Sequence, residues 1–267
     1  MNETEREAIM REIAKKTAVY TLPGMDDVVV ESLTYNTGYE ELAMDVYYPP
    51  PAMGIARPPV AVVVFGYPDP PGAIRRYGPM TSWARLIAAS GVACVIYATN
   101  ECAENIHAVV RHIRANAESL SVDGGRIGLW AASASGCVAL SALMRDGALK
   151  CAALLCGFTM DLDGSTRFAD AAKEYLFVNA CAGKSADDLP DSVPMLFVRA
   201  GREQFPGVNE AMDAVVARAV ARNLPVTLVN HATGVHGFDI YENNDLSREM
   251  IRRVLAFLTF HLGAQAM

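Results

Sequence analysis

Residues 126–140 read RIGLWAASASGCVAL and combine an apolar run with a cluster of small residues. Residues 126–132 are predicted to form a strand and the residues that follow a helix, so the chain must turn sharply at 132–134. A side chain at such a strand-to-helix turn lies exposed above the edge of the sheet. The backbone N–H groups at the start of the helix point to the same place.

Two serines occupy this turn, and we expect Ser133 to be a nucleophile. The turn brings the residues two positions before and after the nucleophile close to neighbouring backbone, where only small side chains fit. The flanks of Ser133 are Ala131 and Ser135, and those of Ser135 are Ser133 and Cys137, so size does not separate them. Position favours Ser133, which directly follows the strand. The alternatives are a packing role for Ser135 and, for the whole stretch, an ordinary turn with two incidental serines.

From residue 59 onward, apolar strands alternate with amphipathic helices. Strands are predicted at 60–65, 92–99, 126–132, 150–158, 193–201 and 224–232, and helices at 80–91, 104–120, 208–223 and 246–262. This alternation implies βαβ units, and therefore an α/β fold with a mostly parallel twisted sheet and helices on both faces. Two earlier β-rich runs, 27–35 and 42–51, indicate an antiparallel N-terminal hairpin at one edge of the sheet. Residues 4–16 are expected to form a short amphipathic helix.

The chain is interpreted as one domain over residues 1–267, because no Gly/Ser-rich linker divides it. Residues 159–192 interrupt the alternation with polar sequence and no clear strand. An insertion of this length after a strand is usually functional, so a lid or pocket wall is predicted there. Four large apolar residues of this segment fit either a pocket wall or the core: Phe168, Tyr175, Leu176 and Phe177.

A nucleophilic serine needs a base within hydrogen-bond reach, and the base needs an acid to orient it. His231 and His236 lie in NHATGVHGFDIY, the loop expected after the last strand, at the carboxyl edge of the sheet where α/β proteins gather their chemistry. His236 is predicted to be the base, since it lies further into this loop. His231 is expected to make a structural hydrogen bond. The remaining histidines are expected to be surface or packing residues: His107, His112 and His261.

The orienting acid is expected after a strand that lies between the serine and the histidine. The segment MLFVRAGREQFPG provides a strand, a turn at Gly201 and then Glu203, which is predicted to be this acid. Asp161 and Asp163 follow the preceding strand and are the alternatives. Their other interpretation is as turn-forming or solvated carboxylates.

Attack on a carbonyl also requires a site for the oxyanion that forms. One backbone N–H is expected from Ala134, directly after the nucleophile. The second is expected from the loop after residues 60–65, where Gly66 is followed by Tyr67 and Pro68. Proline has no N–H, so Tyr67 is the predicted donor.

These segments resemble the α/β-hydrolase superfamily. The chain order Ser133, Glu203, His236 is that of the superfamily, and the resemblance covers about residues 25 to 265. GLWAASASG, VRAGREQFPG and GVHGFD are most similar to small bacterial dienelactone-hydrolase-like proteins and carboxylesterases. The resemblance implies an α/β-hydrolase fold and a serine hydrolase that cleaves a small carboxylic ester or lactone through an acyl-serine intermediate.

The sequence departs from the usual elbow of this superfamily, Gly-x-Ser-x-Gly. Both glycines are replaced, by Ala131 and Ser135. We expect these replacements to be tolerated if neither position requires a positive φ. Dienelactone hydrolases proper use cysteine where this chain has Ser133, and Cys137 lies too far into the helix to take its place.

Two other functions fit the same residues. One is a catalytically silent ligand-binding protein on the same fold. The other is an acyltransferase or perhydrolase that uses the same triad, since only the access of water separates these activities from hydrolysis.

Charge and composition narrow the partners. The formal net charge is −7 and no Lys/Arg-rich block is present, which argues against nucleic acid and against an anionic membrane surface. The N-terminus is charged from its second residue and no run approaches the ~20 apolar residues of a membrane span, so a cytoplasmic protein is predicted. The apolar stripes of the first and last helices leave room for a homodimer.

No cofactor and no metal are predicted. The loop FGYPDPPG lacks a GxGxxG or Walker pattern, and the histidines lack ligand spacing beside the cysteines. The six cysteines are interpreted as buried, reduced thiols. Arg75, Arg76 and Arg202 are interpreted as surface residues, with binding of a substrate carboxylate as the alternative.

Overall fold

The computed structural model describes residues 3–69, 71–160 and 167–264, with the side chains of residues 3–7 left out of the description. The described residues form an eight-stranded sheet in the order β1-β2-β4-β3-β5-β6-β7-β8. The strands are β1 (Val29–Asn36), β2 (Glu41–Tyr48), β3 (Val60–Val63), β4 (Ala93–Tyr97), β5 (Ile127–Ala132), β6 (Ala152–Leu155), β7 (Met195–Arg202) and β8 (Val226–Val235).

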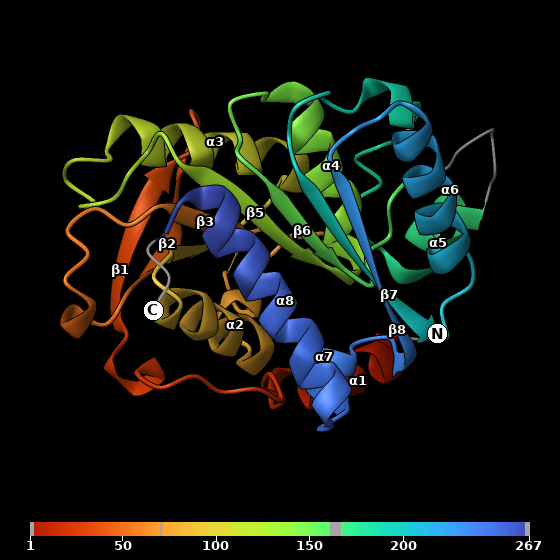
Figure 1. Ribbon diagram of the computed structural model, residues 1–267, viewed down its shortest axis with the longest axis horizontal. Helices are drawn as coiled ribbons and strands as arrows, with labels where there is room; N and C mark the ends of the chain where they lie inside the picture. Colours follow the sequence, from red (N-terminus) through yellow and green to blue (C-terminus); the bar gives the residue numbers. More distant parts are fainter. Residues whose placement is uncertain (1–2, 70, 161–166, 265–267) are drawn as a thin grey trace.

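Strands β3 to β8 pair in parallel, whereas β1 and β2 form an antiparallel hairpin at one edge and β2 runs antiparallel to β4. The helices are α1 (Glu3–Ala14), α2 (Gly78–Ala89), α3 (Cys102–Ala115), α4 (Gly136–Arg145), α5 (Arg167–Tyr175), α6 (Val208–Ala221), α7 (Phe238–Tyr241) and α8 (Asp245–Leu262). Figure 1 shows α3, α4 and α6 on one face of the sheet and α2 and α8 on the other. The predicted α/β class, with its edge hairpin, is confirmed.

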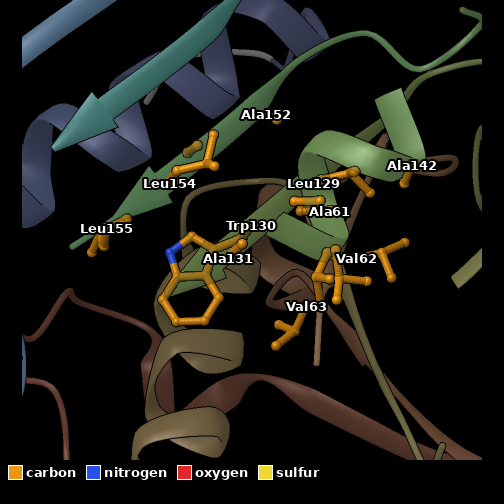
Figure 2. Packing of buried hydrophobic residues seen from close by; sticks show 14 of the residues in the cluster. Ala61, Val62, Val63, Leu129, Trp130, Ala131, Ala142, Ala152, Leu154 and Leu155 are labelled. Carbon is orange, nitrogen blue, oxygen red and sulfur yellow. The ribbon is translucent and has the colours of Figure 1, made fainter. Parts of the chain in front are cut away.

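The central strands are apolar without alternation because helices cover both of their faces. Every residue of β3, β4 and β6 is buried. Figure 2 shows side chains of β3, β5 and β6 packed together, with the Trp130 ring projecting from β5. Trp130 lies against Trp83 of α2, with ring centroids 4.8 Å apart. Burial of each large apolar side chain contributes about 1.5–3 kcal/mol, so these strands form a rigid base for the loops at their ends.

Most predicted helix and strand bounds shift by a few residues, and two of these differences have a clear cause. The helix expected over 104–120 ends at Ala115, where Asn116 leaves helical geometry at φ −112° and its Nδ2 donates to the carbonyl of His112 at 2.9 Å. The strand expected to end at residue 232 continues to Val235. A register irregularity between Ala200 and Arg202 accommodates the extra residues, so the loop that holds His236 begins only after Val235.

The segment 159–192 adds no strand among its described residues. It contributes α5 and a short 3-10 turn at Ala186–Asp188. Its backbone contacts the loop after β3, where the N–H of Val178 donates to the carbonyl of Gly66 at 2.8 Å. The segment therefore packs beside the loop that follows β3.

Candidate active site

The turn after β5 holds Ser133 in a left-handed conformation. A 3-10 turn at Ser133–Ser135 joins β5 to α4, and the φ of Ser133 is 53°. Ser135 has φ −78°, and Ala131 is not among the residues with positive φ. The two positions where glycine is replaced therefore do not need glycine, as expected, and the unusual conformation belongs to Ser133 itself.

Close backbone contacts explain why small residues surround this turn. A Cβ added at Gly136 would lie 2.5 Å from the carbonyl oxygen of Phe158, and a Cβ added at Gly66 would lie 2.4 Å from that of Ala134. The N–H of Phe158 also donates to the carbonyl of Ser133 at 2.9 Å. The turn is thus fixed between the loops that follow β3 and β6.

Three residues from distant parts of the chain form a hydrogen-bonded series. His236 Nε2 lies 2.8 Å from Ser133 Oγ, and His236 Nδ1 lies 2.8 Å from Glu203 Oε2. Glu203 follows β7 and His236 directly follows β8, so both side chains come from the carboxyl edge of the sheet. The structure therefore brings together the three residues predicted from the sequence.

Further contacts hold the imidazole and the carboxylate in place. The N–H of Phe205 donates to Glu203 Oε1 at 2.9 Å, and the N–H of His236 donates to Gln204 Oε1 at 3.0 Å. The Phe205 ring packs edge-on against the His236 ring. The side chain of Glu203 is 3% exposed and that of His236 is 13% exposed. A carboxylate shielded from water orients and stabilises an imidazolium more strongly than an exposed one.

The predicted oxyanion donors lie beside the serine. Gly66, Tyr67, Ser133 and Ala134 line the same cavity. The Tyr67 ring packs against Phe177, and the carbonyl of Gly66 is held by the segment 159–192 as described above. The loop after β3 is thereby fixed across the start of α4, where an oxyanion on a carbonyl attacked by Ser133 would form.

The other histidines do not reach this site. His231 is fully buried in β8, and its Nε2 lies 3.0 Å from Ser247 Oγ, which confirms the expected structural hydrogen bond. His107 and His112 lie on α3, and His261 lies on α8. The alternative acids, Asp161 and Asp163, fall outside the described residues.

The interpretation of Arg75 is wrong. Arg75 is buried and forms an ion pair with Asp45 of β2, so it is neither a surface residue nor a ligand for a substrate carboxylate. The neighbours of Arg75, Ile74 and Arg76, give no local signal for such a pair, since Asp45 is distant in the chain. Arg76 and Arg202 are exposed, as expected.

A cavity of about 630 Å³ opens beside Ser133 and His236. Its wall is mainly apolar and aromatic, and includes Phe65, Tyr77, Trp83, Trp130, Phe158, Phe205 and Tyr241. Of the four residues of the 159–192 segment considered above, Tyr175 lines the cavity, Phe168 and Phe177 pack with Phe158, and Leu176 is exposed. Of these four residues, Tyr175 is therefore the one that contributes to the cavity wall.

Two contributors to this cavity were not predicted from the sequence. Ile9, Met10 and Ile13 of α1 form part of its wall, and so does Asp239 of α7. The amphipathic pattern of residues 4–16 was the available signal for α1, but it did not say which surface the apolar face covers. Asp239 follows His236 in the segment HGFD and gave no sign of lying in a pocket.

Comparison with solved structures identifies the fold. The chain superposes on a thermostable esterase from Pseudomonas putida with a TM-score of 0.73 and 16% identity, over 99% of this chain and 92% of that chain. An alpha/beta hydrolase enzyme from the metagenome of Lake Arreo gives a TM-score of 0.73 at 17% identity, over 98% and 90%. One of two fungal esterases from Rhizomucor miehei gives 0.69 at 17% identity, over 98% and 92%. The fold is therefore that of the α/β hydrolases.

No protein-family model and no curated protein matches the chain. Within the described ranges, no helix has the length and apolar character needed to cross a membrane. No group of three or more His, Cys, Asp or Glu side chains in those ranges is placed to hold a metal ion.

Proposed function

We propose that the protein is a serine hydrolase that cleaves a small carboxylic ester or lactone through an acyl-serine intermediate. The observation that carries this proposal is the series Ser133–His236–Glu203, with both hydrogen bonds at 2.8 Å, at the wall of a largely apolar cavity. The α/β-hydrolase fold, which the chain shares with solved esterases, also supports the proposal. The resemblance of its sequence to dienelactone-hydrolase-like proteins and carboxylesterases supports it as well.

In the proposed reaction, His236 Nε2 takes the proton from Ser133 as Oγ bonds to the carbonyl carbon. Glu203 accepts a hydrogen bond from His236 Nδ1 and stabilises the charged form of the imidazole. The backbone N–H groups of Ala134 and Tyr67 bind the oxyanion, and each such donor contributes about 3–4 kcal/mol to the transition state. His236 then protonates the leaving alcohol.

Deacylation follows the reverse path. His236 takes a proton from water, the resulting hydroxide bonds to the acyl carbon, and the second oxyanion occupies the same site. Its collapse breaks the bond to Ser133 Oγ, which recovers its proton from His236. In a lactone the alcohol and the acid belong to one molecule, so the product is a single hydroxy acid.

Cys137 does not replace Ser133 as the nucleophile. It lies in α4, its Sγ donates to the carbonyl of Val178 at 3.0 Å, and burial raises the pKa of its thiol to about 12. A buried thiol of this kind is almost wholly protonated at neutral pH and is a poor nucleophile. The proposed reaction therefore uses serine chemistry where dienelactone hydrolases proper use cysteine.

The test compares two serine-to-alanine variants. We expect Ser133→Ala to lower the turnover of p-nitrophenyl acetate and butyrate at least about 10³-fold, whereas Ser135→Ala stays near the wild-type rate. A fluorophosphonate probe should label the wild type and Ser135→Ala, but not Ser133→Ala. Wild-type turnover by Ser133→Ala would refute the assignment, and a wild type that is neither labelled nor active would favour the silent ligand-binding protein.

A further inference from the structure

The cavity contains one carboxyl that the proposed reaction does not use. Asp239 lies on α7, is 6% exposed, and lines the cavity together with Ser133 and His236. Glu203, the acid of the series, is not part of the cavity wall. Among the described residues of that wall, Asp239 supplies the sole carboxyl, and none is lysine or arginine.

The carboxyl of Asp239 is fixed, but its hydrogen-bonding capacity is not filled by side chains. Its Oδ2 accepts a hydrogen bond from Trp83 Nε1 at 2.7 Å, and the carboxyl also accepts one from the backbone N–H of Asp239 itself. The backbone carbonyl of Asp239 accepts a hydrogen bond from the N–H of Val19 at 2.8 Å. A carboxylate offers about four acceptor positions. In the part of the chain that the structure describes, neither lysine nor arginine forms an ion pair with it.

An apolar side chain at position 239 would be buried at a lower cost in folding free energy than the carboxyl of Asp239. Trp83 is fully buried and lies against Trp130, so Asp239 faces aromatic surroundings. A carboxyl in such a place is destabilising unless hydrogen bonds compensate for the lost water. A group on a bound substrate can supply that compensation, and an apolar analogue of the substrate would then be rejected.

The surroundings favour an uncharged donor as the partner. A substrate carboxylate would be repelled by Asp239. An ammonium group would need the ionised carboxylate, yet burial raises the pKa of Asp239 and so opposes its charge. A hydroxyl donates to the carboxylate, and it also pairs with the protonated acid, so it is satisfied in either state.

We propose that Asp239 is a specificity-determining residue that accepts a hydrogen bond from a hydroxyl group on an otherwise apolar ester or lactone. The proposal rests on the hydrolase function proposed above. It narrows the substrate class to compounds with an apolar body, which contacts Trp83 and its neighbours, and one hydroxyl placed away from the scissile bond.

The test uses esters that differ in a single group. The probes are p-nitrophenyl esters of 3- and 4-(hydroxymethyl)benzoate, of the matching ethylbenzoates and of the matching (aminomethyl)benzoates. Their side groups have nearly the same size and are a hydroxyl, a methyl and an ammonium at the same position. The readout is the ratio of kcat/KM for the hydroxymethyl ester to kcat/KM for the ethyl ester, which cancels any general effect on the triad.

In the wild type we expect this ratio to be one or more for at least one of the two ring positions. In Asp239→Leu the ratio should fall about tenfold or more, because the hydroxyl then enters an apolar site without a partner. Asp191→Leu is the matched control, because it makes the same substitution at an exposed carboxyl that does not line the cavity. Its ratio should stay within about threefold of the wild type.

Several results would overturn the proposal. One is a wild-type ratio below one at both ring positions, and another is an unchanged ratio in Asp239→Leu. A higher kcat/KM for the aminomethyl ester than for the hydroxymethyl ester would show that the site selects a cation. If Asp239→Leu does not fold, the wild-type ratio decides alone. Hydrolysis of the ethyl esters together with any of these results refutes this inference but not the hydrolase function, whereas no hydrolysis of any ester refutes the function.

Discussion

Ser133 combines a candidate nucleophile with an unfavourable backbone conformation. Its φ of 53° lies in the left-handed region, which costs a residue with a Cβ about 1–2 kcal/mol. The hydrogen bond from the N–H of Phe158 and the tight contact with Gly66 hold the turn in this conformation. Strain of this kind persists only where the surrounding structure stabilises it, and it is common at functional sites.

Glycine at this position should relieve the strain. We expect Ser133→Gly to be about 1 kcal/mol more stable to unfolding than Ser133→Ala, since both lack the hydroxyl and only alanine keeps a Cβ at positive φ. The measurement is urea unfolding of both variants, followed by circular dichroism. Ser135, with φ −78°, is the matched control: there Ser135→Gly should be no more stable than Ser135→Ala. Equal stabilities of the two Ser133 variants would contradict the strain.

The carboxylate of Glu203 should matter through its charge as well as its hydrogen bond. Glu203→Gln keeps a similar shape but cannot stabilise an imidazolium at His236, so we expect kcat for ester hydrolysis to fall by about 10²–10⁴-fold. Glu242→Gln is the control, because Glu242 accepts a hydrogen bond from the N–H of Val235 and does not bond the His236 ring. Equal activities of the two variants would argue against Glu203 as the orienting acid.

The loop after β3 and the turn before α4 act as one structural unit. The carbonyl oxygen of Ala134 lies 2.4 Å from the position of a Cβ at residue 66, and the carbonyl of Gly66 accepts a hydrogen bond from the N–H of Val178. One proposed oxyanion donor, Ala134, belongs to the first of these contacts. The other, Tyr67, directly follows Gly66 in the chain. Their separation is therefore set by backbone packing and not by side chains.

A methyl group at residue 66 should disturb this geometry. We expect Gly66→Ala to lower kcat at least about tenfold, because its Cβ would lie 2.4 Å from a backbone oxygen and the loop or the turn must move. Gly147→Ala is the control, since Gly147 has no atom within 4 Å of the added Cβ. Melting temperatures of both variants separate lost activity from lost fold. Wild-type kcat in Gly66→Ala would show that the loop does not position the oxyanion.

Local sequence patterns predicted most strands and helices. They did not predict contacts between segments that are remote in the chain. Short apolar runs without alternation, such as Val60–Val63 before its Gly/Pro loop, are typical of strands covered on both faces, so the sheet was predictable from the sequence. The site followed because the polar residues that end parallel strands gather at one edge. The extension of β8 depends on an irregularity in its pairing with β7, and the pocket wall formed by α1 depends on tertiary packing; neither has a local signature.

Strand order explains how three remote segments of the molecule meet. Ser133 follows β5, Glu203 follows β7 and His236 follows β8, and these strands lie in the order β5-β6-β7-β8. The histidine must therefore reach back across two strands to contact the serine. Gly237 follows His236, has a left-handed φ of 71° and is the residue directly before α7. Asp239, which lines the cavity, belongs to α7.

The buried thiols make the whole molecule sensitive to alkaline pH. All six cysteines are free and buried. Burial raises the pKa of Cys102 to about 11 and that of Cys151 to about 12, and it raises the pKa values of Cys94, Cys156 and Cys181 further. The native protein therefore keeps protons that the unfolded chain releases above the ordinary thiol pKa of 9.0.

Because the native state binds more protons than the unfolded state above pH 9.0, the free energy of unfolding must fall as the pH rises from there towards 12. Each thiol contributes a slope of up to about 1.4 kcal/mol per pH unit. Urea unfolding between pH 7 and about 10.5, in the presence of a reductant, measures this slope. Cys151→Ala removes one buried thiol, so its slope should be shallower by about the contribution of one group. A free energy of unfolding that stays constant over this range would show that the thiols ionise as readily in the native protein as in the unfolded chain.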